Sequence, residues 1–129
     1  MTRPRLKVFF DGGCRPNPGR IEVAVVARGI AYVFDELGHG TSTDAEWLAL
    51  IKALEVAQEL GGADFVLIGD ARVVIDQANG MNKCRSPALL EHRARFAALA
   101  AKCPPSRIRW IARAQNLAGI ALAARHQRG

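Results

Sequence analysis

The chain has the length and composition of one globular domain. It contains 129 residues, of which 50% are hydrophobic and 23% are charged, and its formal net charge is +6. A chain of this length buries enough apolar surface to fold without disulfides or a structural metal, and this composition argues against disorder. We therefore expect a single domain that spans residues 1–129.

The sequence gives no sign of a membrane segment or of secretion. No apolar run approaches the roughly 20 residues of a membrane span, and the chain does not open with a secretory leader. The cysteines Cys14, Cys84 and Cys103 are widely separated and form no CxxC pair. This spacing is typical of a reducing compartment and argues against a disulfide framework or a zinc knuckle. We therefore expect a cytoplasmic protein that does not associate with membranes.

Positive charge is concentrated in the last third of the chain. Residues 92–129 contain eight Lys or Arg and no Asp or Glu, whereas all 12 acidic residues lie within residues 1–91. A one-sided basic segment favours a polyanionic partner such as a nucleic acid. A solvated basic face that keeps the protein soluble explains the charge alone equally well.

The hydrophobic pattern predicts a mixed α/β fold. Apolar alternation or continuous apolar runs predict strands at 5–11, 21–27, 31–36, 63–69 and 107–112, and turn residues at 12–19 join the first two. Helical periodicity and capping signals predict helices at 44–60, 71–78, 87–102 and 115–127. The order βββαβααβα indicates a five-stranded mixed sheet, with its first three strands antiparallel, flanked by helices.

Three acidic residues stand where a catalytic site would form. Asp11 and Asp70 each end an apolar strand, and ligands of open α/β sheets bind outside the carboxyl ends of parallel strands. Glu46 lies on the sheet-facing side of its predicted helix, opposite the polar face that carries Glu55. A carboxylate there is costly unless it is paired or bound to a metal. The structural alternatives are that Asp70 caps the next helix and that Glu46 completes a capping box with Thr43.

If the three carboxylates converge, they need a cation or raised pKa values. Two unit charges 4 Å apart repel by about 4 kcal/mol at an effective dielectric constant of about 20. Carboxylate oxygens suit Mg²⁺, which binds one or two carboxylates together with water and substrate phosphate. Two such ions about 3.5–4 Å apart clamp the attacking water and the leaving oxygen of a phosphodiester. We therefore expect Mg²⁺ as the cofactor, with Mn²⁺ as a substitute.

Three motifs resemble those of type 1 ribonuclease H, and the resemblance covers nearly the whole chain. The motifs are FFDGGCRPNPG at 9–19, TSTDAEWLAL at 41–50 and GDARVVIDQANG at 69–80. Ser42 and Thr43 stand where asparagines are usual in the family, and Ala71 replaces the usual serine. The resemblance implies a ribonuclease H-like fold and a metal-dependent endonuclease that hydrolyses the RNA strand of an RNA/DNA hybrid.

The resemblance also assigns roles to individual residues. Asp11, Glu46 and Asp70 would be the catalytic metal ligands. The residues that would contact the hybrid, where the 2′-hydroxyl in the minor groove separates RNA from DNA, are Gly12, Gly13, Cys14, Asn17, Ser42, Thr43, Gln77 and Asn116. The partner is therefore an RNA/DNA hybrid, and no protein partner is implied.

The last motif departs from the family's pattern. Asn116 and the Leu-Ala pair at 122–123 are kept, but Ile120 stands where the family carries a fourth metal-binding aspartate. No Asp or Glu follows Glu91, so a shift of register cannot supply one. We therefore expect reduced activity. The alternative is a catalytically impaired module that binds hybrid or double-stranded nucleic acid without cleaving it.

Other features of the family are missing from the sequence. Only residues 79–85 separate the two middle helices, which leaves no room for a basic insertion that grips DNA. No histidine-bearing loop precedes the last helix, and we expect His39, His92 and His126 at the surface. A third class of protein, a small phospho-acceptor or nucleotide-binding domain, is not supported, because the sequence contains no Walker-type or GxGxxG loop.

Overall fold

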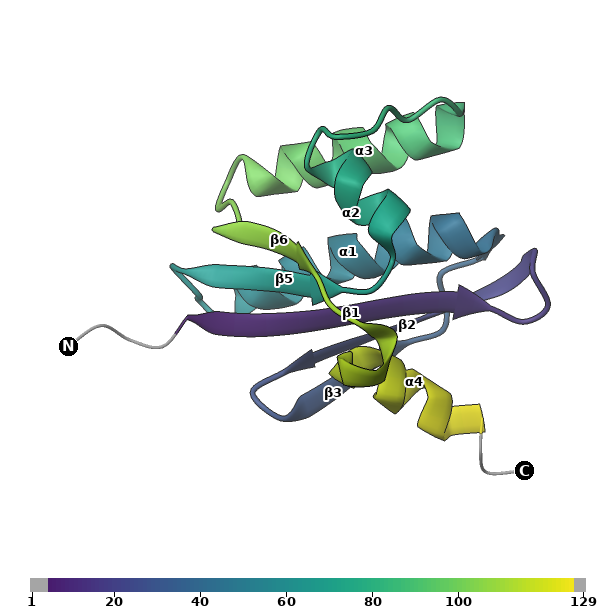
Figure 1. Cartoon of the computed structure of the whole chain (residues 1–129), viewed down its shortest axis with the longest axis horizontal. Coiled ribbons are helices and arrows are strands. Elements are labelled where there is room, and N and C mark those ends of the chain that lie inside the picture. Colours follow the sequence, from purple (N-terminus) through teal and green to yellow (C-terminus); the bar gives the residue numbers. More distant parts are fainter. Residues whose placement is uncertain (1–4, 127–129) are drawn as a thin grey trace.

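The computed structural model describes residues 5–126 as a mixed β-sheet with helices on both faces (Figure 1). Its elements are β1 (Leu6–Cys14), β2 (Gly19–Ala27), β3 (Ile30–Phe34), β4 (His39–Gly40), α1 (Ser42–Glu59), β5 (Phe65–Gly69), α2 (Arg72–Ala78), α3 (Pro87–Ala100), β6 (Arg107–Trp110), the 3₁₀ turn η1 (Arg113–Gln115) and α4 (Leu117–His126). The predicted order is confirmed, with the two-residue strand β4 and the turn η1 as additions. Within these residues, no helix is both long and apolar enough to cross a membrane.

The strand order brings the first and fifth strands together as parallel neighbours. The sheet runs β3-β2-β1-β5-β6, and β4 pairs with β2 beside this path. β1, β2 and β3 are antiparallel, as predicted, whereas β5 is parallel to β1 and β6 is parallel to β5. Phe9 pairs with Ile68. Asp11 and Asp70 each lie two residues beyond this pair, so they reach the same edge of the sheet.

The turn between the first two strands is shorter than predicted. β1 continues to Cys14 and β2 begins at Gly19, so only residues 15–18 form the turn. Gly12 still pairs with Val23, and Cys14 pairs with Ile21. The turn propensity of the glycines is outweighed because pairing with β2 satisfies the backbone groups of this segment.

The main core lies between the sheet and α1. Trp47, Leu50 and Leu54 of α1 are completely buried, as is Phe10 of β1. Burial of one such side chain contributes about 1.5–3 kcal/mol, so this interface holds α1 firmly against the sheet. α4 covers part of the opposite face, where it contacts β1 and β2 (Figure 1). The candidate site lies at the sheet edge between α1 and α4.

Candidate active site

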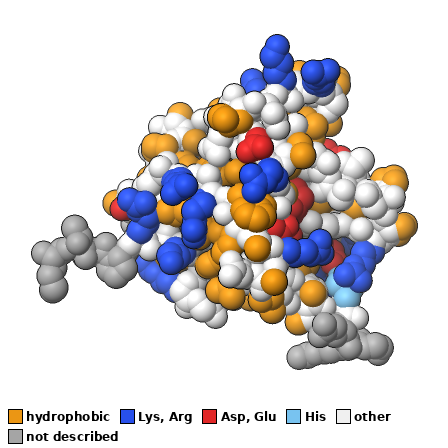
Figure 2. Space-filling model, viewed as in Figure 1, with side chains coloured by type: hydrophobic (Ala, Val, Ile, Leu, Met, Phe, Trp, Pro, Cys, Tyr) orange, Lys and Arg blue, Asp and Glu red, His pale blue; other side chains and the backbone are white. Residues whose placement is uncertain are grey.

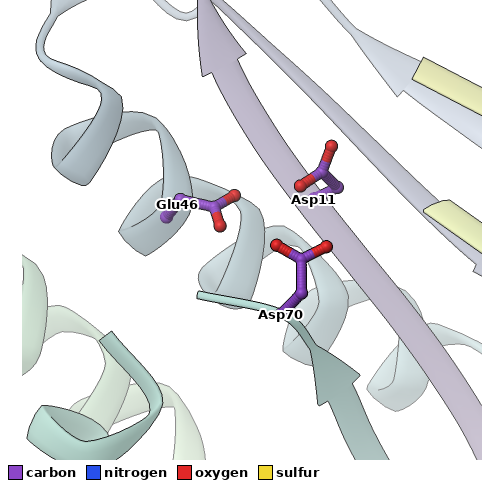
Figure 3. A group of neighbouring side chains, drawn as sticks. All are labelled: Asp11, Glu46 and Asp70. Atoms are coloured by element: carbon purple, nitrogen blue, oxygen red, sulfur yellow. The ribbon is translucent and has the colours of Figure 1, made fainter. Parts of the chain in front are cut away.

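The three predicted carboxylates converge at one edge of the sheet. Asp11 comes from β1, Glu46 from the second turn of α1, and Asp70 from the residue that follows β5 (Figure 3). One carboxylate oxygen from each residue lies within 4.8 Å of the others. Side chains that are 24 to 59 positions apart in sequence therefore form one compact group of oxygen ligands.

Gly12 allows α1 to approach β1 closely enough to deliver Glu46. A Cβ atom at Gly12 would lie 2.2 Å from the carbonyl oxygen of Ala45, so no other residue fits without a shift of backbone. The backbone N–H of Gly12 donates a hydrogen bond to Oε1 of Glu46. The absence of a side chain and the free N–H therefore act together to hold Glu46 beside Asp11.

The first turn of α1 is capped without Glu46. Thr41 is the N-cap: its Oγ1 accepts a hydrogen bond from the Asp44 N–H at 3.2 Å, and Oδ2 of Asp44 accepts one from the Thr41 N–H at 3.0 Å. The predicted capping box of Thr43 and Glu46 is therefore wrong, because the helix begins two residues earlier. Glu46 lies one turn inside the helix and its carboxylate is available to the acidic cluster.

Asp70 is held by a buried amide rather than used as a helix cap. The N-cap of α2 is Ala71, which has no side-chain cap. Nδ2 of Asn116 donates hydrogen bonds to Oδ2 of Asp70 at 2.9 Å and to the Phe10 carbonyl at 3.0 Å. Oδ1 of Asn116 accepts the N–H of Ala118 at 3.1 Å. Asn116 is completely buried and its amide positions Asp70, whereas the sequence predicted that it contacts the substrate.

The environment of the cluster disfavours negative charge when no metal is bound. Burial raises the pKa of Asp11 to about 6, the charge of Asp70 adds to this effect, and Arg113 acts in the opposite direction. Burial also raises the pKa of Glu46 well above its ordinary value, and the charge of Asp11 adds to it. A divalent cation would therefore stabilise the ionised form of these carboxylates.

The carboxylates lie in a cleft that also contains most of the predicted substrate contacts. The cleft has a volume of about 490 Å³. Oδ1 of Asn17 accepts the Ser42 N–H at 3.1 Å, and Nδ2 of Asn17 donates to Oγ of Ser42 at 3.2 Å, which joins the turn after β1 to the start of α1. Of the eight predicted contacts, those that line the cleft are Gly12, Gly13, Cys14, Asn17, Ser42 and Thr43.

Gln77 lies in the core and not in the cleft, where a contact with substrate was predicted for it. Its side chain is 6% exposed. Oε1 of Gln77 accepts a hydrogen bond from the indole N–H of Trp47 at 2.9 Å, and its Nε2 donates to the Lys83 carbonyl at 3.5 Å. A buried indole N–H needs an acceptor, and Gln77 supplies it.

The helix that would carry a fourth ligand presents Gly119 to the cluster. A Cβ atom at Gly119 would lie 3.6 Å from Oδ2 of Asp11 and 3.7 Å from Oδ2 of Asp70. Ile120, the position predicted from motif spacing, is 53% exposed and is absent from the cleft lining. Neither residue offers a carboxylate, so α4 adds no acidic ligand to the site.

The cleft also contains residues that the sequence did not reveal. Arg113 and His126 both line it, and Nε2 of His126 lies 2.6 Å from Oε2 of Glu22. His126 is exposed, as expected. Its place seven residues after Gly119, on the same face of the helix, was a signal that it also lines the cleft. Arg113 lies in the 3₁₀ turn η1, where periodicity gives no signal.

The fold and the acidic cluster together define the ribonuclease H-like class. The family model described as "Reverse transcriptase-like" matches residues 9–126. A ribonuclease HI of Halobacterium salinarum is 36% identical over 124 residues, which cover 92% of this chain and 62% of that protein. The bifunctional protein Rv2228c of Mycobacterium tuberculosis is 30% identical over 118 residues, covering 87% of this chain and 32% of that protein. The chain thus spans less than two thirds of the curated relatives it matches.

Solved structures agree with this assignment. The crystal structure of ribonuclease H1 from Halobacterium salinarum superposes with a TM-score of 0.84 and 32% identity, covering 92% of this chain and 93% of the other. The LC11 ribonuclease H1, crystallised in complex with an RNA/DNA hybrid, gives a TM-score of 0.79 and 27% identity, covering 88% and 89%. The chain belongs to the type 1 ribonuclease H family. The resemblance inferred from the three motifs is confirmed.

Proposed function

We propose that this protein is a metal-dependent endonuclease that hydrolyses the RNA strand of RNA/DNA hybrids, with Mg²⁺ as its ion. The observation that carries this proposal is the convergence of Asp11, Glu46 and Asp70, with one oxygen of each within 4.8 Å of the others. The hybrid-bound relative, which shares this fold with a TM-score of 0.79, supports the choice of substrate. The basic C-terminal part of the chain is consistent with a polyanionic partner.

The donor set fits a hard divalent cation. Three carboxylates provide only oxygen ligands, which Mg²⁺ and Mn²⁺ prefer to sulfur or imidazole. Asp11, Glu46 and Asp70 would hold the metal, which supplies charge stabilisation to the phosphodiester and lowers the pKa of the attacking water. The cleft is open beside the cluster, so substrate oxygens and water can complete the coordination.

The residues around the cluster orient the carboxylates and the substrate. Gly12 fixes Glu46 through its N–H, and Asn116 fixes Asp70 through its amide, so neither carboxylate has to reorganise during the reaction. Asn17 and Ser42, hydrogen-bonded to each other at the exposed side of the cleft, offer polar groups to the sugar-phosphate backbone of the hybrid. Only RNA carries a 2′-hydroxyl for such groups to recognise.

We further propose that activity is weaker than a four-carboxylate site would give. Neither Gly119, which faces the cluster, nor Ile120 supplies a carboxylate. One side of the site therefore has less negative charge with which to hold a second cation. The same observation favours the second candidate function, a module that binds hybrid without cleaving it.

The test is cleavage of an end-labelled RNA/DNA hybrid by the purified protein, with Mg²⁺ and with Mn²⁺, resolved on a denaturing gel. We expect cuts in the RNA strand, and cuts should disappear with EDTA and in an Asp11→Asn variant. Binding of the hybrid without cleavage above the Asp11→Asn control, in either metal, would contradict the nuclease and support the binding module.

A further inference from the structure

A second group of positive charges lies on the sheet, away from the carboxylates. Lys7 of β1 and Val66 of β5 are paired, and Val66 is paired with Arg107 of β6. In a sheet, paired residues project from the same face. Lys7 and Arg107 therefore stand on one face, at the two sides of β5.

The next row of the sheet adds a third cation to this face. Phe9 of β1 pairs with Ile68 of β5, and Ile68 pairs with Arg109 of β6. Arg109 lies two residues after Arg107, so both project from the same side of β6. Lys7, Arg107 and Arg109, with Arg5 at the margin, line a groove of about 250 Å³. We call Lys7, Arg107 and Arg109 the β1–β6 basic patch.

The charges of the β1–β6 basic patch are not neutralised within the protein. Among the described residues, the ion pairs involve none of the three cations, whereas Arg5 at the margin is paired with Asp64. The groove is lined by these cations with Val66 and Ile68 and by no acidic residue. Three like charges on nearby strands repel one another, and a bound polyanion would relieve that repulsion.

The floor of the groove is apolar. Val66 is 6% exposed and Ile68 is completely buried, although both face the groove. Long cationic side chains cover apolar surface with their aliphatic stems and keep their charged ends in water. We therefore expect the aliphatic stems of the β1–β6 basic patch to cover β5 and its charged groups to face the solvent.

The patch and the carboxylates share one face of the molecule. Figure 2 shows Lys and Arg side chains gathered over the β1 and β6 end of the sheet, with the acidic side chains of the cleft further right on the same face. Asp11 is four residues beyond Lys7 in β1, which is about 13 Å along a strand. Phosphates follow each other about every 3.4 Å of axis along one strand of a duplex. The patch thus lies about four base pairs from the cluster.

We propose that the β1–β6 basic patch binds the phosphate backbone of the nucleic-acid duplex where it runs out of the cleft. The proposal rests on the proposed function, because the duplex held at the carboxylates is the occupant that reaches the patch. Charge complementarity, the common face and the short distance along β1 all favour this occupant. The patch would raise affinity and leave the chemical step unchanged, because it does not touch the carboxylates.

The experiment measures binding of an 18-base-pair RNA/DNA hybrid by fluorescence anisotropy at several NaCl concentrations. An Asp70→Asn background suppresses cleavage. The test variant carries Lys7→Gln, Arg107→Gln and Arg109→Gln. We expect its affinity to fall by about tenfold or more at 0.1 M salt, and the slope of log K against log[salt] to decrease by about three, one for each contact removed.

The matched control carries Arg93→Gln, Arg95→Gln and Lys102→Gln, three exposed cations on or just after α3, so its net charge changes equally. We expect its salt slope to stay at the parent value. The variant Arg107→Lys with Arg109→Lys should keep the parent slope, because lysine also binds phosphate as a point charge. Each single neutralisation should lower the slope by about one, which keeps the test available if the triple variant fails to fold.

Equal slopes for the two triple variants would overturn the proposal and would leave the patch as a charged edge that prevents aggregation. With Asp70 intact, we expect KM to rise in the test variant while kcat is unchanged, and a loss confined to kcat would also overturn it. Failure of the proposed function is distinguishable, because the parent protein would then cleave no hybrid whatever the slopes show.

Discussion

Nδ2 of Asn116 lies 2.9 Å from Oδ2 of Asp70, and the same nitrogen lies 3.0 Å from the carbonyl oxygen of Phe10, the residue before Asp11. One buried amide therefore ties Asp70, which follows β5, to the backbone of β1 beside Asp11. Since Asn116 immediately precedes α4, this amide also fixes the helix that faces the cluster.

Replacing Asn116 should damage both stability and activity. Asn116→Ala leaves the Phe10 carbonyl without its buried donor and frees Asp70 to move, and one unsatisfied buried group costs about 1–3 kcal/mol. We expect the free energy of unfolding to fall by that amount, measured by urea denaturation, and hybrid cleavage to fall by at least tenfold. Cleavage that survives unchanged in a folded Asn116→Ala variant would show that Asp70 needs no positioning.

Gly12 and Gly13 provide a matched pair of substitutions. Gly12→Ala places a Cβ atom 2.2 Å from the Ala45 carbonyl oxygen, whereas a Cβ atom at Gly13 meets nothing within 4 Å. Overpacking of this kind costs about 1–3 kcal/mol, and it displaces α1 with Glu46. We expect Gly12→Ala to lower the melting temperature and abolish cleavage, while Gly13→Ala leaves the melting temperature near that of the parent. Similar melting temperatures for the two variants would contradict the close approach of α1 and β1.

Gln77 should act on stability and not on substrate binding. Gln77→Ala removes the acceptor for the Trp47 indole N–H, which costs about 1–3 kcal/mol. Trp47→Phe removes the donor instead, so in a double-mutant cycle the two losses should be less than additive. KM for the hybrid should stay unchanged in Gln77→Ala. A raised KM in a stable variant would restore the role that the motif resemblance assigned to this residue.

The arrangement of strands and the three carboxylates could be predicted because each depends on a short-range signal. Apolar runs mark β1 and β5, and Asp11 and Asp70 follow from where those runs end. Helical periodicity places Glu46 on the buried side of α1. These signals survive folding because burial of the same apolar residues drives the formation of the sheet and its packing against α1.

Other features depend on contacts between distant segments, which the sequence does not display. The sequence predicted Gln77 and Asn116 as substrate contacts. Only their partners Trp47 and Asp70, 30 and 46 positions away, explain why these polar side chains are buried. The helix start at Thr41 was missed because two Thr-based capping boxes compete within three residues. Residues 12–14 were predicted as part of a turn, but their pairing with β2 makes them part of strand β1.

The pKa values of the cluster predict that the metal-free protein loses stability as the pH rises. Burial raises the pKa of Asp11 to about 6 in the folded state, and the unfolded value is about 3.9. Between these values the unfolded chain releases its proton first. The free energy of unfolding should therefore fall, by at most about 3 kcal/mol from this group, and stay lower above pH 6. Glu46, whose pKa is also raised, acts in the same direction.

The measurement is the melting temperature in EDTA from pH 4 to pH 8, repeated with Mg²⁺. We expect a decrease with rising pH in EDTA and a recovery above pH 6 on addition of Mg²⁺, because the metal binds the ionised carboxylates. Asp11→Asn should reduce both effects and leave the part that Glu46 contributes, because burial is the main cause of the raised pKa of Glu46. A melting temperature in EDTA that is flat or rises across this range would contradict the raised pKa values.

Position 119 is where a fourth carboxylate would complete the cluster. The space at Gly119 accepts a Cβ atom in ordinary contact with Asp11 and Asp70, at 3.6 and 3.7 Å, whereas Ile120 is 53% exposed. Gly119→Asp should therefore lower the Mg²⁺ concentration for half-maximal cleavage, by roughly tenfold if the added charge contributes about 1.4 kcal/mol. Ile120→Asp should change it little. Gly119→Ala is the control for helix stabilisation without charge, and Gly119→Asn is the control for an added polar side chain. A gain in Ile120→Asp and none in Gly119→Asp would show that the motif spacing, and not the rotation of α4 seen in the structure, identifies the missing ligand.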